Sequence, residues 1–365
     1  MERAVTVHAF GRQFRHRPGY LNAASIGVPP QEAADAVAEA VRSWADGRSR
    51  PADFDSAVET ARAGFAALTG MPVDDVAQGA TVSGLVADLA AGVPDGTRVL
   101  VAEHEFASLT RPFARQARRG VRVTAVPLPE LAAHAGGHDV VAVSVVQSAD
   151  GRIADLDALH DARARHGVRL LYDLSQAAGW FPVRRTAVTG ADAVVAAGYK
   201  WLMAPRGAAW LARRPTWTDG PPRGRAWPEP PGSAAGWYGA ADRATGMYVP
   251  DPAPRPGPAG TEESPVWLAH VGAAVTLPWL AELDPQALYD EVVGHADALR
   301  DRLGLAPSGS AVVSVRDPGV ADRLAGEGIT ASVRGGAARL AFHLAATGDD
   351  VDAAARALSG AALAG

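Results

Sequence analysis

Short apolar segments alternate with helical ones from about residue 76, and this alternation limits the fold more than any other feature. Residues 140–146 form a nearly continuous run of valine and alanine, as in a strand that is covered on both faces. Residues 156–166 have the pattern of a helix between two such strands. The alternation therefore predicts a parallel α/β sheet. The predicted strands are 98–102, 121–126, 140–146, 169–173 and 191–196.

Helical patterns flank this region on both sides. Residues 31–47 and 53–69 predict two helices before it, and 266–283 and 288–303 predict two helices after it. A small α+β unit is expected to follow, and at 365 residues the chain suits two domains. Its elements are strands at 311–315, 329–333 and 338–342, a helix near 321–324 and a last helix from Asp349. The expected division is an N-terminal segment at 1–20, a large domain at 21–264 and a small C-terminal domain at 265–365.

The stretch 213–264 has a different composition from the rest of the chain. It combines many prolines and glycines with Trp217, Trp227, Trp237 and Tyr238. This content is too aromatic for a flexible linker, and a long ordered loop that covers a site or a partner surface is expected. A poorly ordered insertion is the alternative.

Several classes of protein are excluded or disfavoured by composition. The chain has no cysteine, which excludes disulfides, zinc–thiolate sites, iron–sulfur clusters and thiol nucleophiles, and no metal is expected. A net charge of −5 with scattered arginines gives no reason to expect nucleic acid. The start lacks an apolar signal core, and no apolar run is long enough to span a membrane. A cytoplasmic protein without a membrane partner is therefore expected.

Lys200 is the only lysine among 35 basic residues. Arginine supplies surface charge equally well, but its guanidinium stays protonated and cannot act as a neutral amine. The retained lysine therefore suggests amine chemistry, such as a Schiff base or proton transfer on nitrogen. A chance survivor of an arginine-rich composition is the alternative.

Asp173 and Lys200 each follow the end of a predicted strand. Ligands of open parallel sheets bind at that edge, so both side chains could enter one crevice. A carboxylate beside an amine suits pyridoxal phosphate (PLP), because the carboxylate keeps the pyridine nitrogen protonated and the lysine binds the aldehyde. The turn 79–84 precedes an apolar helix at 85–91, where amides and hydroxyls could hold a phosphate. Asp173 as a turn residue and Thr81 as a simple helix cap are the alternatives.

Three segments resemble the class V aminotransferase family of fold-type I PLP enzymes, which includes cysteine desulfurases, kynureninases and isopenicillin-N epimerase-like proteins. They are Tyr20 to Gly27, the Asp-x-x-Gln motif at 173–176, and the lysine segment from Ala191 to Gly207. The resemblance implies a large domain with a mostly parallel seven-stranded sheet and a small α+β C-terminal domain. It also implies PLP as cofactor and a homodimer with a shared active site.

The resemblance implies roles for residues around the cofactor ring. Lys200 would hold PLP as an internal aldimine and move the substrate Cα proton, and Asp173 would pair with the pyridine nitrogen. Gln176 would lie near the phenolic oxygen, with Ser148 or Gln147 as a second neighbour.

An aromatic side chain is expected to stack on the ring. The spacing to Pro112-Phe113 favours Phe106, and His104 is the second choice. A plain core position for Phe106 is the alternative.

The phosphate positions implied by the resemblance are Ala80, Thr81, Val82 and Tyr199. Either Thr261 or Ser264 would reach the phosphate of the neighbouring subunit. Ala197 stands where the family often has serine, so one phosphate contact is missing.

The substrate is expected to be an α-amino acid. Arg339 resembles the family arginine that clamps the α-carboxylate in a bidentate pair, and Asn22 and Ala24 are the other substrate positions. The resemblance implies an aminotransferase or a C–S/β-lyase, and the missing cysteine predicts that the chain is not a persulfide-forming cysteine desulfurase. The alternatives are an amino-acid epimerase and a non-catalytic PLP-binding member. Fold alone does not identify the amino acid or the reaction.

Overall fold

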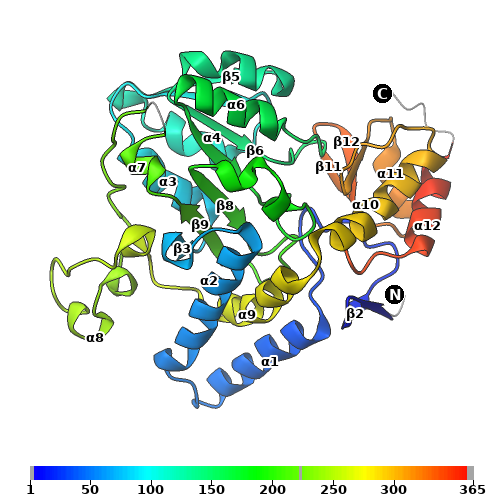
Figure 1. The fold of residues 1–365 in the computed structure, drawn as a ribbon. Helices are drawn as coiled ribbons and strands as arrows, with labels where there is room; N and C mark the ends of the chain where they lie inside the picture. The colour runs from blue at the N-terminus through cyan, green and yellow to red at the C-terminus, as the bar shows by residue number, and fades with distance from the viewer. Residues whose placement is uncertain (1–3, 222–223, 360–365) are drawn as a thin grey trace.

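A seven-stranded sheet forms the centre of the molecule in the computed structural model, which describes residues 4–221 and 224–359 (Figure 1). The strand order is β3-β9-β8-β7-β6-β4-β5. β9 pairs antiparallel with both of its neighbours, and the remaining pairs are parallel. The predicted mostly parallel α/β sheet is confirmed. The strands are β3 (Val76–Gly79), β4 (Arg98–Ala102), β5 (Arg122–Val126), β6 (Val140–Ser144), β7 (Arg169–Asp173), β8 (Ala193–Ala197) and β9 (Ala209–Arg213).

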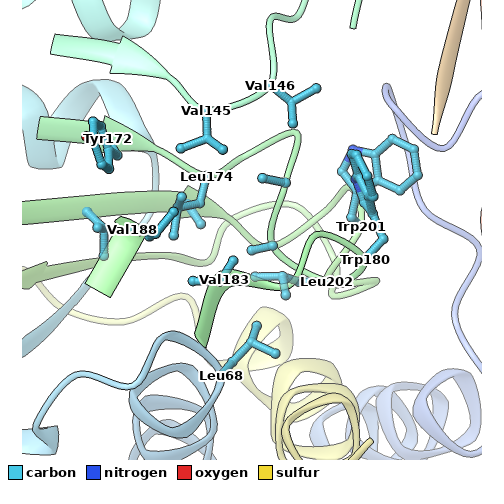
Figure 2. Close-up of a cluster of buried hydrophobic side chains, with 14 of the residues drawn as sticks. Leu68, Val145, Val146, Tyr172, Leu174, Trp180, Val183, Val188, Trp201 and Leu202 are labelled. Carbon is cyan, nitrogen blue, oxygen red and sulfur yellow. The ribbon is translucent and has the colours of Figure 1, made fainter. Parts of the chain in front are cut away.

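The central strands are apolar along their whole length because helices cover both faces of the sheet. All five residues of β6 are buried. Val141 and Val143 pack into one apolar cluster, whereas Val140 and Ala142 pack into another on the opposite face, as the two-residue period of a strand requires. Figure 2 shows part of the first cluster beyond the strand ends, where Trp180 and Trp201 pack together.

The helices of the large sheet lie in two layers. On one face, side chains of α2 (Asp55–Thr69), α6 (Leu156–His166) and α9 (Trp267–Glu282) join the first cluster. On the other face, α3 (Val82–Gly92) and α4 (Ala107–Ala114) form the second cluster together with Trp217 and Trp227. The other α-helices that precede α9 are α1 (Gln31–Ala45), α5 (Leu131–His134), α7 (Thr216–Asp219) and α8 (Arg243–Gly246). None of the helices in 4–221 and 224–359 is long and apolar enough to cross a membrane.

A second, antiparallel sheet of order β10-β12-β11 forms the C-terminal unit. The N-terminal segment joins it, since Ala341 N donates to Leu21 O (2.8 Å) and Leu21 N donates to Thr330 O (3.0 Å). This pairing carries residues 22–27 toward the large sheet. The elements are β10 (Val312–Val315), β11 (Ser332–Arg334), β12 (Ala337–Ala341), α10 (Pro285–Arg302), α11 (Val320–Gly326) and α12 (Gly348–Leu358).

Some elements differ from the sequence prediction. The hairpin β1 (Val5–Ala9) and β2 (Arg12–His16) was not expected, and neither was β9. α10 begins at Pro285 because Asp284 caps it through the amides of Gln286 and Ala287. α9 packs with the large-sheet layer, and the domain boundaries stay a prediction.

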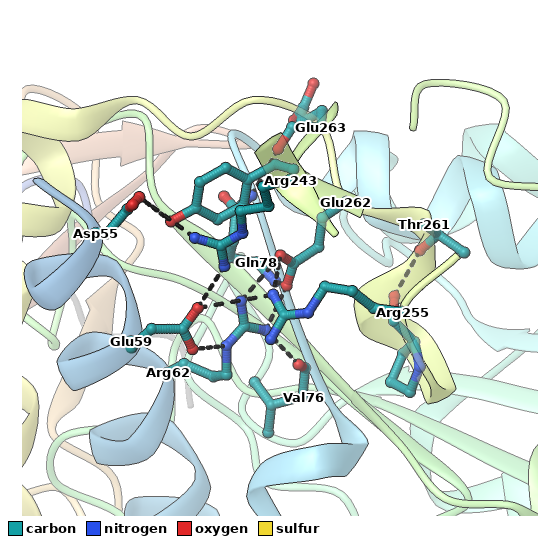
Figure 3. A network of polar contacts seen from close by, with 12 residues as sticks. Asp55, Glu59, Arg62, Val76, Gln78, Arg243, Arg255, Thr261, Glu262 and Glu263 are labelled. Atoms are coloured by element: carbon teal, nitrogen blue, oxygen red, sulfur yellow. Dashed lines mark hydrogen bonds and ion pairs between the residues drawn. The ribbon is translucent and has the colours of Figure 1, made fainter. Parts of the chain in front are cut away.

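The described part of the 213–264 stretch is held on α2 by a polar network (Figure 3). Arg62 and Glu262 form a buried ion pair, and Arg62 also donates to Val76 O (2.6 Å). Arg243 bonds Glu59 (2.7 Å), and Trp217 and Trp227 are buried in the second cluster. Glu262 also accepts from Gln78 N on β3 (2.9 Å), so this network reaches the strand that precedes the predicted phosphate turn.

Candidate active site

Lys200 lies in the turn after β8, at the carboxyl edge of the sheet. The turn is fixed from within, because Gly198 N donates to Ala208 O (2.9 Å) and Ala204 N donates to Gly198 O (2.9 Å). Gly27 packs against it so closely that a Cβ would lie 1.8 Å from the Lys200 carbonyl oxygen. Only glycine fits there, which explains how the N-terminal segment reaches the lysine.

The Lys200 amine is buried among charges of both signs. Its side chain is 6% exposed. Burial lowers the pKa of Lys200 to about 8; Asp173 opposes this shift, and three arginines, Arg339, Arg334 and Arg206, add to it. A large fraction of the amine is therefore neutral near pH 8, as a nucleophile or base needs to be.

Two cavities meet at Lys200. The smaller one, of about 80 Å³, is called the inner compartment; it is lined by residues that include Thr81, Ser83, Asp173, Ser175 and Ala197. The larger one, of about 660 Å³, is called the outer compartment; its lining includes Ala24, Ser25, Ser148, Arg334 and Arg339. Both compartments share Phe106, Tyr199, Lys200 and Arg206 as walls.

Asp173 is the last residue of β7 and is almost completely buried. Burial raises the pKa of its carboxyl, and hydrogen bonds from Ser175 together with the charge of Lys200 oppose the shift. The Ser175 amide donates to the carboxylate at 2.7 Å, and the Ser175 hydroxyl accepts from Ala197 N at 3.0 Å. Because a buried carboxylate requires a cationic or hydrogen-bonded partner, a protonated ring nitrogen would suit this position.

The predicted phosphate turn lines the inner compartment. Thr81 is the N-cap of α3, and its Oγ1 accepts from Gly84 N at 3.1 Å. The Ala80 amide already donates to Glu263 Oε1 at 2.7 Å, so this amide has a partner within the chain. The guanidinium of Arg206 lies 4.9 Å from the centroid of the Tyr199 ring, and no described acidic residue pairs with it. Arg206 and the start of α3 together provide a positive site for an anion.

These residues fit PLP. The unpaired Arg206 beside the start of α3 suits a phosphate, the buried Asp173 suits a pyridinium nitrogen, and Lys200 between them suits an aldehyde.

Gln176 and Ser148 lie together beside the outer compartment. Gln176 Nε2 donates to Ala24 O (3.0 Å) and to Ser148 Oγ (3.2 Å), and Gln176 Oε1 accepts from Trp201 Nε1 (2.8 Å). Gln147 lines neither compartment; its amide donates to Glu105 (3.1 Å). Of the two residues predicted to lie with Gln176 near the phenolic oxygen, Ser148 is the one that contacts Gln176.

Phe106 and His104 occupy different environments. Phe106 lines both compartments, and its ring centroid lies 5.2 Å from Lys200 Nζ. His104 is exposed, has a left-handed backbone (φ 63°) and lines neither compartment. Glu105 between them is tied to β6, because it accepts from Ser144 N (2.8 Å) and from Phe106 N (2.8 Å). This contact orients the loop so that Phe106 faces the lysine.

Arg339 is buried in the wall of the outer compartment with only neutral partners. It donates to Ser332 Oγ (3.1 Å), Ser148 Oγ (3.1 Å) and Ser25 Oγ (3.2 Å). Burial and the nearby Arg334 lower the pKa of Arg339 to about 10. No described acidic residue pairs with this guanidinium, so a carboxylate entering the compartment would give it its missing counter-ion.

The other predicted positions are more remote from Lys200. Ala24 lines the outer compartment, whereas Asn22 lines neither, and its buried Oδ1 has no partner in the described chain. Thr261 donates to Pro258 O (2.9 Å) and lines a separate cavity within the 213–264 stretch. Ser264 lies beside Gly236. Thr261 and Ser264 therefore line neither compartment, and the expected contact of one of them with a neighbouring subunit stays a prediction.

Two arginines of the site were missed by sequence reasoning. Arg206 follows the lysine motif within Pro205-Arg206-Gly207, so its position six residues after Lys200 was a usable signal. Arg334 offered none, because it is one of 34 arginines and becomes part of the site only through the pairing of β11 with β12.

Comparisons with known proteins agree with this geometry. The family model described as aminotransferase class-V matches residues 30–219, more than half of the chain. No curated protein matches the sequence.

Three solved structures with the same fold each have 18% sequence identity to the chain. The cysteine desulfurase CsdA from Escherichia coli has a TM-score of 0.74, covering 93% of this chain and 94% of that one. The cysteine desulfurase from Thermococcus onnurineus NA1 has a TM-score of 0.75 with coverages of 93% and 94%. The cystine C-S lyase C-DES, in complex with its reaction product cysteine persulfide, has a TM-score of 0.77 with coverages of 94% and 98%. At this identity the likeness shows the fold.

Proposed function

This chain belongs to the class V aminotransferase family and is therefore a PLP-dependent transferase or lyase, and we propose that it acts on a free α-amino acid, with Lys200 as cofactor anchor and as base at Cα. One observation carries the proposal. A buried amine of pKa about 8 lies where two cavities meet, one containing the buried Asp173 and the other the buried Arg339. The predictions of family, cofactor and enzyme class are confirmed.

The residues of the chain have separate tasks. When bound, PLP supplies an electron-withdrawing ring that stabilises negative charge at the substrate Cα. Asp173 keeps a proton on the ring nitrogen, and Arg206 with the start of α3 binds the phosphate. Arg339 binds the α-carboxylate through its guanidinium and so orients the substrate. Lys200 Nζ takes the proton from Cα and returns it at a later step.

The number of side chains in the outer compartment that can act as a base restricts the types of reaction that it can catalyse. Among its described lining residues Lys200 is the only amine, and histidine, aspartate and glutamate are absent. Epimerisation is most simply catalysed by two bases on opposite faces of Cα, whereas transamination and β-elimination need only one. We therefore favour transamination or β-elimination over epimerisation.

A C–S lyase is the first candidate because the structural neighbour C-DES, which shares this fold, is named a cystine C-S lyase. A thiolate is a good leaving group, so β-elimination from a cysteine conjugate needs no base beyond Lys200. Transamination, which also needs only this base, is the second candidate.

The expectation that the chain is not a persulfide-forming desulfurase went further than the absence of cysteine allows. Without cysteine the protein itself cannot carry a persulfide. However, C-DES is named a C-S lyase whose product is cysteine persulfide, so a persulfide can leave with the product. Lyase chemistry of this kind stays open to the chain.

The test is a panel of amino acids with identified products. The PLP-loaded protein is incubated with L-cystine, S-alkyl cysteines and proteinogenic amino acids. Pyruvate with ammonia and a thiol or persulfide indicates β-elimination, whereas a keto acid with cofactor in the amine form indicates transamination. Lys200→Ala is the matched control, with its fold verified by circular dichroism. Absence of turnover in the wild type, or unchanged turnover in Lys200→Ala, would overturn the proposal.

A further inference from the structure

The outer compartment has an unusual balance of charge. Its described lining contains Lys200, Arg206, Arg334 and Arg339 but no acidic residue. The chain as a whole has 40 acidic and 35 basic residues, so the positive excess belongs to this wall and not to the protein in general. A simple α-amino acid brings one carboxylate, and Arg339 is sufficient for it. The remaining cations therefore require another explanation.

Arg206 has a role on the inner side. It lines both compartments, and at the inner one it lies beside the phosphate turn with Thr81 and Ser83. Arg334, in contrast, lines only the outer compartment. It is the cation that the proposed function leaves unused.

Strand register places Arg334 on the same face of the small sheet as Arg339. In the antiparallel pair of β11 and β12, Ser332 is opposite Arg339, and their side chains are hydrogen-bonded at 3.1 Å. Arg334 is two residues from Ser332, so its side chain leaves the same face. Two residues of a strand span roughly 7 Å. The backbone positions of Arg334 and Arg339 are therefore separated by about the length of two strand residues, and both side chains leave the same face of the sheet.

The Arg334 guanidinium is free to bind a ligand. It is exposed, and it donates to the carbonyl of the preceding residue, Val333 O, at 3.0 Å. No acidic residue in 4–221 and 224–359 forms an ion pair with it. Guanidiniums with no acidic partner at the wall of a cavity are suited to carboxylate or other planar anions.

Part of the lining of the outer compartment is apolar. It comes from the start of α1 and from the segment after Lys200, and includes Pro29, Ala33, Val37, Met203 and Pro205. Gly272 on α9 lets Pro205 approach so closely that a Cβ would lie 2.5 Å from the Pro205 Cδ. A substrate held here would have apolar contacts in addition to those of its charged groups.

We propose that the substrate is an α-amino acid whose side chain ends in an anionic group, and that Arg334 binds this group while Arg339 binds the α-carboxylate. This inference rests on the proposed function, which assigns Arg339 to the α-carboxylate. The same wall disfavours a distal ammonium, because no described acidic residue lines it. It thus discriminates against L-cystine, whose far end carries an ammonium as well as a carboxylate. It favours an S-substituted cysteine with a terminal carboxylate.

A binding experiment tests the site without catalysis. Calorimetry of the PLP-loaded protein compares adipate with its monoamide, which have the same length but two and one carboxylates. We expect adipate to bind about tenfold more tightly, as for one hydrogen-bonded charge. Arg334→Gln should abolish the difference and Arg334→Lys should retain part of it. Arg316→Gln is the matched control, because Arg316 is exposed beside the same sheet but does not line the compartment.

Turnover then tests the substrate class. S-(2-carboxyethyl)-L-cysteine and its amide serve for elimination, and L-glutamate and L-glutamine serve for transamination. We expect a preference of about tenfold in kcat/KM for the acid of a pair, expressed mainly in KM and lost in Arg334→Gln.

The proposed function and the proposed anion site at Arg334 would be overturned by different results. Equal binding and equal turnover of acid and amide would overturn the distal anion site while leaving the proposed function in place. A preference that survives in Arg334→Gln would also overturn it. Selective binding of adipate without turnover of any pair would overturn the proposed function but support Arg334 as an anion site.

Discussion

The two compartments beside Lys200 are built in different ways. The inner one is assembled at strand ends, from the turns after β3, β7 and β8, and its Asp173, Ser175 and Lys200 are buried. The outer one combines the N-terminal segment, the turn after Lys200, α1, α9 and the small sheet, and Arg334, which lines only this compartment, is exposed.

The difference suggests that the inner compartment anchors the cofactor and the outer compartment recognises the substrate. Strand ends of a parallel sheet have a fixed geometry, which suits groups that anchor a cofactor. Walls drawn from distant loops and a second sheet can vary without disturbing that geometry, which suits recognition of a particular substrate. The predictions below test whether the two sides of Lys200 act separately.

The largest effect is expected where both sides meet. Lys200→Ala removes the amine shared by the compartments, and kcat/KM should fall by about 10⁴-fold because general base and anchor are lost together. The visible absorbance of the bound cofactor should also change. If the variant kept the wild-type spectrum and rate, the lysine would have neither role.

The next effect concerns the inner side. Asp173→Asn removes the carboxylate but keeps its size, and kcat should fall by about 10³-fold because charge developing on the ring is no longer supported. The Asp173 carboxylate also raises the pKa of Lys200, so this pKa should drop below about 8 in the variant. The pH dependence of the rate of PLP uptake by the unloaded protein measures that shift. An unchanged or raised midpoint would contradict the assignment.

The corresponding change on the outer side should act in the opposite direction on the same amine. Arg339→Met removes a cation that lowers the pKa of Lys200, so this pKa should rise above about 8. The loss of the α-carboxylate contact should raise KM by about 10²-fold. Arg122→Met, at an exposed position on β5, controls for loss of a distant charge. Equal effects of both variants on KM would show that Arg339 does not bind substrate.

Protonation of the buried His343, which lies close to the outer compartment, should make the stability of the fold depend on pH. His343 is buried and lies edge-on to Trp201, with ring centroids 5.3 Å apart, and Trp201 in turn donates to Gln176. Burial lowers the pKa of His343 to about 4. Between this value and the ordinary value of about 6.5, the unfolded chain binds more protons than the folded one, so stability falls as pH decreases.

The expected slope from His343 is about 1.4 kcal/mol per pH unit within that window. His270 has a pKa of about 4 for the same reason, burial, and contributes a similar slope. Urea unfolding at several pH values measures the combined slope of the free energy of unfolding against pH. His343→Leu should reduce this slope to the contribution of His270. A slope that is unchanged in the variant would mean that His343 is already protonated in the folded protein.

The inner compartment could be predicted from the sequence because its residues occur in short motifs with fixed spacing. Asp173 ends one strand and Lys200 follows another, both strands have an unambiguous apolar pattern, and the sheet brings the two residues to one edge. β9 was missed because it is antiparallel and follows directly on the lysine turn, without an intervening helix to mark it.

The outer compartment could be predicted only in part. Arg339 was recognised from a resemblance, but its serine partners come from residues 25, 148 and 332, which no local pattern connects. Arg334 depends on the register of β11, and this strand began three residues later than the sequence suggested. Long-range pairing of this kind is decided by tertiary packing and not by local propensity.

The smallest expected effect tests the choice of Phe106 over His104 as the side chain that stacks on the ring. Phe106→Ala should lower kcat/KM about fivefold, because a ring contact contributes roughly 1 kcal/mol. His104→Ala should leave the rate unchanged, since His104 is exposed and lines neither compartment. Phe106→Leu should behave like Phe106→Ala if stacking matters, and like the wild type if the side chain only fills space. The reverse order, with His104→Ala the slower enzyme, would mean that the left-handed turn at His104 rearranges to bring the imidazole over the cofactor.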